Sequence, residues 1–152
     1  MTEIRTRHLM SLSLKISEMQ DLGKTPLGHR RVAVADGGSF EGTRLKGTVL
    51  KGGSDWVLER TDGALQLDVR LTLRTDDGEL IGMTYRGTRH GPAKVIERLN
   101  RGEPVDPSDY YFRTAAFFET SSAKYGWLNG IVAVATGHRP PGGPLYEIFE
   151  VL

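Results

Sequence analysis

The sequence predicts an all-β protein: a single closed antiparallel β-barrel of about nine strands with one short helix. Three observations predict this fold class. Apolar and polar residues alternate along much of the chain, Asp-Gly and Asn-Gly turn signals recur at short intervals, and one segment alone has a convincing helical pattern. The 152 residues contain no linker or repeat, so residues 1–152 are expected to form one domain. A two-sheet sandwich is the alternative architecture.

The clearest strands are predicted at residues 8–17 and 64–74. From residue 65 to residue 74, Leu or Val at every odd position alternates with a polar residue at every even position. This alternation is typical of an antiparallel strand with one apolar and one polar face. Further strands are predicted at 30–35, 43–50, 55–59, 80–88, 111–119, 131–138 and 145–151. Turns are expected at Asp36-Gly37-Gly38, Gly52-Gly53, Asp62-Gly63, Asp77-Gly78, Asn129-Gly130 and 140–143.

The predicted helix covers residues 92–100. Pro92 stands near its start, good helix formers follow, and Gly102 lies just past its end. Residues 101–107 are predicted to form a loop. Residues 125–129 are expected to add a short helical turn before the last hairpin.

Composition excludes several classes of function. The net charge is +1, from 20 Lys and Arg against 19 Asp and Glu, so neither nucleic acid nor an anionic membrane is an expected partner. Cysteine is absent, which excludes disulfides, thiol nucleophiles and Cys-based zinc sites. No apolar run is long enough to span a membrane, and the default expectation is a cytoplasmic protein. No metal or cofactor is expected, because four histidines lie far apart without ligand spacing: His8, His29, His90 and His138.

Polar residues at strand positions are the first candidates for a site. Asp68 and Arg70 share one face of the strand at 64–74. They form either a weak ion pair on a face that contacts water, or a pair turned into the lumen of the barrel across a ligand. In the second interpretation, Asp68 is a candidate catalytic base and Arg70 a candidate ligand-binding residue.

A second group of candidates begins with Asp55 and Trp56, directly after the Gly52-Gly53 turn. Asp55 either starts the strand by accepting turn N–H groups or faces inward as a catalytic base; Trp56 is either core or a stacking wall for a ligand. Arg113 lies among bulky apolar neighbours, where a charge requires a partner. Tyr85 and Trp127 are further candidates for the ligand-binding wall, and each is equally consistent with plain core.

The chain resembles domain-of-unknown-function family 3237 over nearly its whole length. The resemblance rests on the order of these motifs: Gly52-Gly53-Ser54-Asp55-Trp56, Asp62-Gly63, Leu67-Asp68-Val69-Arg70, Thr75-Asp76-Asp77-Gly78, Tyr111-Phe112-Arg113, Phe118-Glu119, Trp127-Leu128-Asn129 and Gly137-His138-Arg139. It implies a closed, calycin-like antiparallel barrel and no settled activity for bacterial members. Some fungal relatives belong to aromatic polyketide pathways and are thought to act as isomerases.

Three functional hypotheses follow. The first is a pocket at one barrel mouth that binds a small cyclic or aromatic organic molecule. The second is a cofactor-free isomerase in which Asp55 or Asp68 moves a proton next to a carbonyl and Arg70 or Arg113 stabilises the oxyanion. The third is a structural module without a ligand, whose polar face pairs with a second copy in a homo-oligomer.

Overall fold

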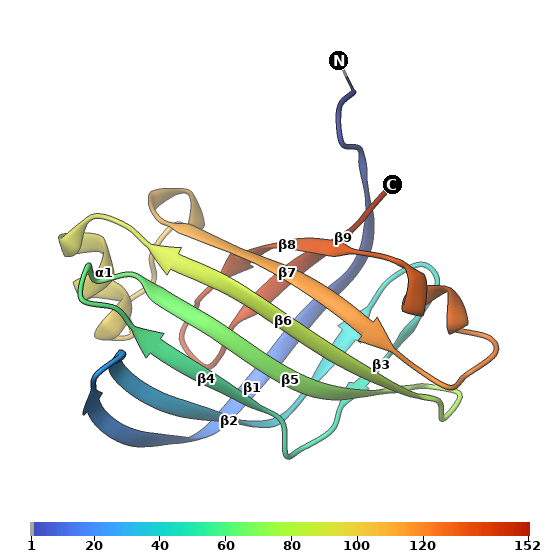
Figure 1. Cartoon of the computed structure of the whole chain (residues 1–152), viewed down its shortest axis with the longest axis horizontal. Helices are drawn as coiled ribbons and strands as arrows, with labels where there is room; N and C mark the ends of the chain where they lie inside the picture. Colours follow the sequence, from blue (N-terminus) through green and yellow to red (C-terminus); the bar gives the residue numbers. More distant parts are fainter. Residues whose placement is uncertain (1) are drawn as a thin grey trace.

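The computed structural model describes residues 2–152 (Figure 1). Within them lie nine β-strands, one α-helix and two short 3₁₀ helices. All strand pairings are antiparallel. The elements are β1 (Thr6–Thr25), β2 (Gly28–Glu41), β3 (Lys46–Val49), β4 (Ser54–Glu59), β5 (Leu65–Thr75), β6 (Leu80–His90), α1 (Ala93–Asn100), η1 (Pro107–Asp109), β7 (Tyr111–Glu119), η2 (Gly126–Gly130), β8 (Ala133–His138) and β9 (Leu145–Val151).

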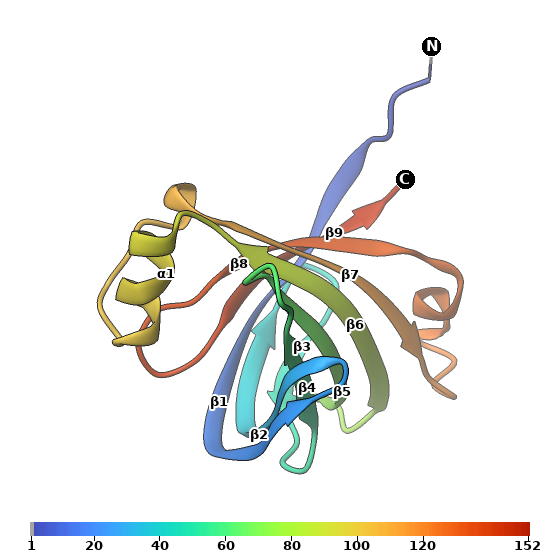
Figure 2. The same cartoon turned by 60° about the vertical axis from the view of Figure 1, so that its left-hand side comes forward.

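The sheet closes on itself. Its strand order is β1-β9-β8-β7-β6-β5-β3-β2-β4, and β1 also pairs with β2 while β5 also pairs with β4. A continuous ring of hydrogen-bonded strands results, and Figure 2 shows how the sheet curves to close it. The predicted closed antiparallel architecture of nine strands with one short helix is therefore confirmed.

Period-two alternation decides which side chains fill the ring. The odd-numbered residues of β5 and β6 point inward, and Leu73 and Ile81 are fully buried there. On β7 and β9 the even-numbered residues point inward, including Phe112 and Ile148. These rows meet in one contiguous apolar core, as expected when each strand has one apolar face.

The predicted turn at Asp36-Gly37-Gly38 is wrong, because this segment lies inside β2. Gly37 and Gly38 have φ of +99° and +151°, and the pairing with β1 shifts register beside them. A Cβ on Gly38 would lie 2.1 Å from the carbonyl oxygen of Ser13, so only glycine fits. The glycines bend β2 at the point where it changes partner, from β4 at residues 29–34 to β3 at residues 38–41.

The first hairpin is also longer than predicted. β1 continues to Thr25 and turns through Pro26 and Leu27 into β2, which extends the hairpin beyond the predicted strand at 8–17. The strand predicted at 43–50 is shorter in the structure, where it is β3 with four residues. The hairpin and the helix lie at the same end of the molecule, on the left of Figure 1.

The predicted helix is confirmed as α1, which begins directly after Pro92. Its residues Val95, Ile96 and Leu99 pack against the core, so the helix covers part of one open end of the ring (Figure 2). The short helical turn predicted at 125–129 is η2, at the opposite end. No helix among residues 2–152 is both long and apolar enough to cross a membrane.

Candidate functional site

A cavity of about 420 Å³ opens at the end of the ring next to α1 and the β1–β2 hairpin. Most of its wall is apolar, with side chains such as Leu14, Val57, Leu67 and Phe112 contributed by different strands. Polar side chains interrupt this wall at a few positions. They are Arg31 of β2, Asp55 of β4, Tyr85 and Arg89 of β6, Asn100 of α1, Arg139 of the β8–β9 loop and Tyr146 of β9.

Asp55 faces the cavity because the odd-numbered positions of β4 point inward. Its carboxylate accepts a hydrogen bond from the backbone N–H of Asp68, with 3.0 Å between N and Oδ1. Burial raises the pKa of Asp55 to about 6, although the Asp68 N–H bond acts in the opposite direction. No basic side chain in the described part of the chain comes within 4.0 Å of this carboxylate. Asp55 is therefore an unpaired carboxyl group that changes protonation close to neutral pH.

Two guanidinium groups in the wall are incompletely satisfied. The buried Nε atoms of Arg31 and Arg89 have no hydrogen-bond partner within residues 2–152. Arg31 reaches Glu59 through Nη2 at 3.5 Å, whereas Arg89 has no carboxylate within 4.0 Å among the described residues. Burial, followed by the nearby charge of Arg139, lowers the pKa of Arg89. Unpartnered buried polar atoms are rare in native structures, so these two require an explanation.

A pair of tyrosines completes the polar part of the wall. The rings of Tyr85 and Tyr146 meet edge to face at 5.1 Å, and Tyr146 makes the same contact with Phe112 at 5.5 Å. Burial raises the pKa of both hydroxyls, and the Tyr85 hydroxyl is raised well above its ordinary range. Both side chains therefore stay neutral.

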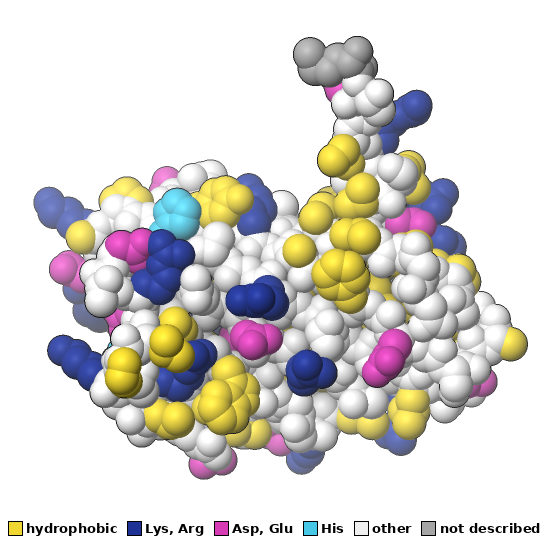
Figure 3. All heavy atoms as spheres, viewed as in Figure 1, with side chains coloured by type: hydrophobic (Ala, Val, Ile, Leu, Met, Phe, Trp, Pro, Cys, Tyr) yellow, Lys and Arg dark blue, Asp and Glu magenta, His cyan; other side chains and the backbone are white. Residues whose placement is uncertain are grey.

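Asp55 and Tyr85 are the two sequence-predicted site residues that line this cavity. Asp68 and Arg70 are exposed on the outer face of β5, so the interpretation that places them in a lumen is wrong. The five apolar residues of β5 point inward and leave the polar row in contact with water. Figure 3 shows basic and acidic side chains interspersed over this outer face.

Trp56, Arg113 and Trp127 are likewise outside the set of described residues that line the cavity. Trp56 is 49% exposed on the outer face of β4, directly after Asp55, because consecutive strand residues point to opposite faces. Arg113 is exposed and donates to the carbonyl of Phe112 at 2.8 Å. Trp127 lies in η2, where the guanidinium of Arg44 stacks 4.0 Å from the ring centroid.

Sequence reasoning missed five polar cavity residues: Arg31, Arg89, Asn100, Arg139 and Tyr146. A signal was present for Arg89, because it continues the inward row that runs through Met83 and Tyr85 on β6. No comparable signal marked Arg31. The residues that follow it on both faces of β2, at 32–35, are all Val or Ala, so alternation does not distinguish the two faces.

The fold and the cavity define a small antiparallel β protein with a pocket whose wall is mostly apolar and carries a few polar side chains. The chain belongs to the family described as "Protein of unknown function (DUF3237)", which it matches over residues 4–151. It is 31% identical to a UPF0311 protein of Rhodopseudomonas palustris over 149 residues, which are 98% of this chain and 97% of that protein. A UPF0311 protein of Clostridium acetobutylicum is 33% identical over 150 residues, 98% and 95% of the two chains.

Solved structures share the whole fold. A protein of Acinetobacter baumannii described as beta-barrel like aligns with a TM-score of 0.87 and 38% identity, covering 99% of this chain and 98% of that one. The crystal structure of a conserved R. palustris protein of unknown function aligns with a TM-score of 0.96 and 30% identity over all of both chains. A structure described as an enzyme from Penicillium herquei has a TM-score of 0.76 at 22% identity, covering 99% and 96%, and therefore shows similarity of fold alone.

Proposed function

We propose that the cavity binds a small cyclic or aromatic organic molecule. The observation that carries this proposal is an apolar cavity of about 420 Å³ into which a few polar side chains converge from separate strands. Pockets for small molecules have this character and run from about 300 to 1,000 Å³. A molecule with one ring or two fused rings fits this volume.

Binding is ascribed to two parts of the wall. Leu67 and Phe112 offer apolar surface to the faces of a flat ring, and Tyr146 supports Phe112 from its edge. Asp55 and Arg89 offer a hydrogen-bond acceptor and donors to polar atoms at the rim of the ligand. The protein therefore orients the molecule by its edge while burying its faces.

A panel of one- and two-ring compounds, measured by thermal shift and isothermal titration calorimetry, tests this proposal. Ala33 lines the cavity, so Ala33→Phe should fill it and weaken binding at least about 10-fold. Trp56→Ala removes an aromatic ring of similar size from the outer face and should leave binding unchanged. If filling the cavity leaves affinity intact, or if Trp56→Ala abolishes it, the proposed pocket is wrong.

A cofactor-free isomerase is the second candidate. It is favoured by the position of Asp55, an unpaired carboxyl group with a pKa raised to about 6, in the same wall as an unpaired Arg89. The Asp55 carboxylate would take a proton from a carbon next to a carbonyl, and the electron pair would move to the carbonyl oxygen. Arg89 would stabilise that oxyanion until Asp55 returned the proton to another carbon of the same molecule.

Turnover and affinity of the Asp55→Asn variant distinguish an isomerase from a binding protein. An isomerase should lose turnover by about 100-fold or more, while affinity for a neutral ligand stays within a few-fold. Its wild-type rate should rise as the pH passes about 6, because the base must be ionised. A ring compound that binds but undergoes no proton exchange with deuterated solvent would identify a binding protein. The homo-oligomeric module stays a prediction, and light scattering measures its oligomeric state.

A further inference from the structure

The cavity carries more positive than negative charge. Three guanidinium groups line it, from Arg31, Arg89 and Arg139, against the single carboxyl group of Asp55. Arg31 has Glu59 as a partner outside this wall, while Arg89 has no carboxylate within 4.0 Å in the described part of the chain. Burial of an unpaired guanidinium is costly unless another group satisfies it.

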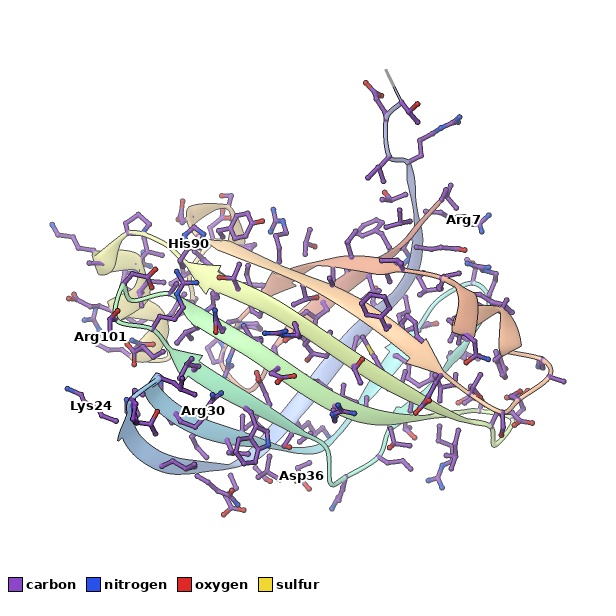
Figure 4. The ribbon with its side chains drawn as sticks, in the orientation of Figure 1. Arg7, Lys24, Arg30, Asp36, His90 and Arg101 are labelled. Carbon is purple, nitrogen blue, oxygen red and sulfur yellow. The ribbon has the colours of Figure 1, made fainter. Side chains whose placement is uncertain are left out.

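Arg89 differs from the other basic residues at this end of the molecule. Figure 4 labels Arg30 on β2 and Arg101 directly after α1, and neither is among the described residues that line the cavity. Arg30 donates through Nη1 to the backbone carbonyl of Trp56 at 2.8 Å, and Arg101 donates through Nε to Glu103 at 2.6 Å. Arg89 therefore stands apart from its neighbours, because its charge is directed to the cavity without a protein partner.

Arg31 and Arg89 line the same cavity, and the charge of Arg31 contributes to lowering the pKa of Arg89, so the two guanidinium groups lie near each other. Arg31 lies on β2, two residues along the inward row from Ala33, which pairs directly with Asp55 on β4. Arg89 lies on β6, in the inward row of Tyr85. Both Nε atoms are buried and unpartnered, and a guanidinium donates through Nε and a terminal nitrogen in a planar fork that matches a carboxylate.

We propose that the ligand of this cavity is a ring compound bearing a carboxylate, held by Arg89 together with Arg31, with its ring against the apolar wall. This inference rests on the proposed function and assigns the chemical class of the ligand. The two oxygens of a carboxylate can accept two parallel hydrogen bonds from the guanidinium of Arg89, and the apolar ring of the ligand then occupies the rest of the cavity. A sugar phosphate suits the site less well, because its hydroxyl groups would lie unsatisfied against Leu14, Val57 and Leu67.

Asp55 makes this binding depend on pH. Bringing a second carboxylate into the cavity disfavours the ionised form of Asp55, so the complex takes up a proton there. The pKa of Asp55 in the free protein is about 6, so anion binding should strengthen as the pH falls from about 8 to 5.5. If the complex keeps the proton throughout this range, the gain in affinity reaches about 80-fold, the ratio of protonated Asp55 at the two pH values.

Charged and titratable groups around Asp55 come from several elements. They are Arg31 and Arg30 on β2, Asp68 on β5, Tyr85 and Arg89 on β6, Tyr146 on β9 and Arg139 in the β8–β9 loop. His29 lies farther out on β2 and contacts Asp21 at 2.7 Å and Glu59 at 3.7 Å. His29→Gln removes this imidazole and its two acidic contacts while leaving the cavity wall intact, and serves as a control for the origin of the pH dependence.

The experiment compares 1-naphthoate with its neutral isostere 1-naphthamide by calorimetry at pH 6. We expect the wild-type protein to bind the acid at least about 10-fold more tightly than the amide. Arg89→Gln should remove that preference, and Arg31→Gln should reduce it. Arg70→Gln, which removes an exposed arginine from the outer face, should keep it. Thermal melts check that each variant folds.

The outcomes separate this inference from the function on which it rests. Equal binding of acid and amide, or a preference for the acid that survives Arg89→Gln, overturns the carboxylate assignment while the pocket stands. Binding of neither compound overturns both. The affinity for 1-naphthoate is also measured from pH 8 to pH 5.5. If its pH dependence is lost in Asp55→Asn and kept in His29→Gln, the inference is supported. If it is kept in Asp55→Asn and lost in His29→Gln, Asp55 is not the origin of the pH dependence.

Discussion

Replacement of Asp55 with Asn should stabilise the protein at pH 8 and have little effect at pH 4. The side chain of Asn has the same shape, and its Oδ1 can still accept the backbone N–H of Asp68, which lies 3.0 Å from Asp55 Oδ1. What the substitution removes is the free energy of holding an ionised carboxylate in a largely apolar cavity without an ion pair.

The magnitude follows from the pKa of Asp55, which burial raises from 3.8 to about 6. The folded protein binds this proton more tightly than the unfolded chain, so stability is highest below pH 3.8 and falls as the pH rises through about 6. The full difference corresponds to about 3 kcal/mol at pH 8 and to about 0.5 kcal/mol at pH 4. Partial access of water to the side chain reduces the first figure, so we expect about 1.5–3 kcal/mol.

Thermal unfolding followed by circular dichroism at several pH values measures this effect. For a domain of this size the gain corresponds to a rise in Tm of about 3–10 °C at pH 8. Asp68→Asn is the matched control, because Asp68 is the exposed carboxylate on the neighbouring strand, and its Tm should change by less than about 2 °C. Wild-type and Asp55→Asn curves that coincide at pH 8, or a difference that is independent of pH, would refute the reasoning that Asp55 is desolvated.

Three further predictions concern stability. Arg89→Met removes an unpaired buried charge and should raise Tm by about 2–4 °C while weakening binding of 1-naphthoate; a lower Tm would show that Arg89 contributes to the fold. Leu73→Ala removes a fully buried side chain and should destabilise the protein by about 2–5 kcal/mol in urea unfolding. Trp56 is half-exposed, so Trp56→Ala should cost less than about 1 kcal/mol. Comparable losses of stability in the two variants would contradict the assignment of inner and outer faces. Gly38→Ala should cost at least about 2 kcal/mol, because its Cβ would meet the Ser13 carbonyl oxygen; an unchanged urea midpoint would mean that β2 does not bend there.

Local sequence signals were sufficient for most of the fold. The uninterrupted alternation of β5 gave its two faces correctly, and Asp62-Gly63 and Asp77-Gly78 marked real turns, with φ of +87° and +91° at the glycines. Gly37-Gly38 carries the same signal with a different outcome. Positive φ at a glycine produces a turn or a bulge according to the strands that lie alongside, and here β1 continues past the glycines.

The candidate site was only partly predictable. Asp55 and Tyr85 were identified as polar or aromatic residues at strand positions, and both line the cavity. Asp68 and Arg70 showed an equally suggestive pattern and lie on the outer face. On β4, Ser54, Trp56 and Leu58 form a more apolar row than the row of Asp55, so hydrophobicity alone favours the wrong face as the inner one.

The sequence by itself determined the position of most strands, the helix and the antiparallel class of this protein, because period-two alternation, glycine turns and helix-start signals act over a few residues. The tertiary structure alone decided which polar side chains meet. Arg31, Asp55 and Arg89 come from three strands whose registers are set by pairings across the closed ring, and a shift of one residue would turn each side chain to the opposite face. The physical reason is that closure is a long-range condition: every strand must satisfy two neighbours at once, and no local pattern contains that information.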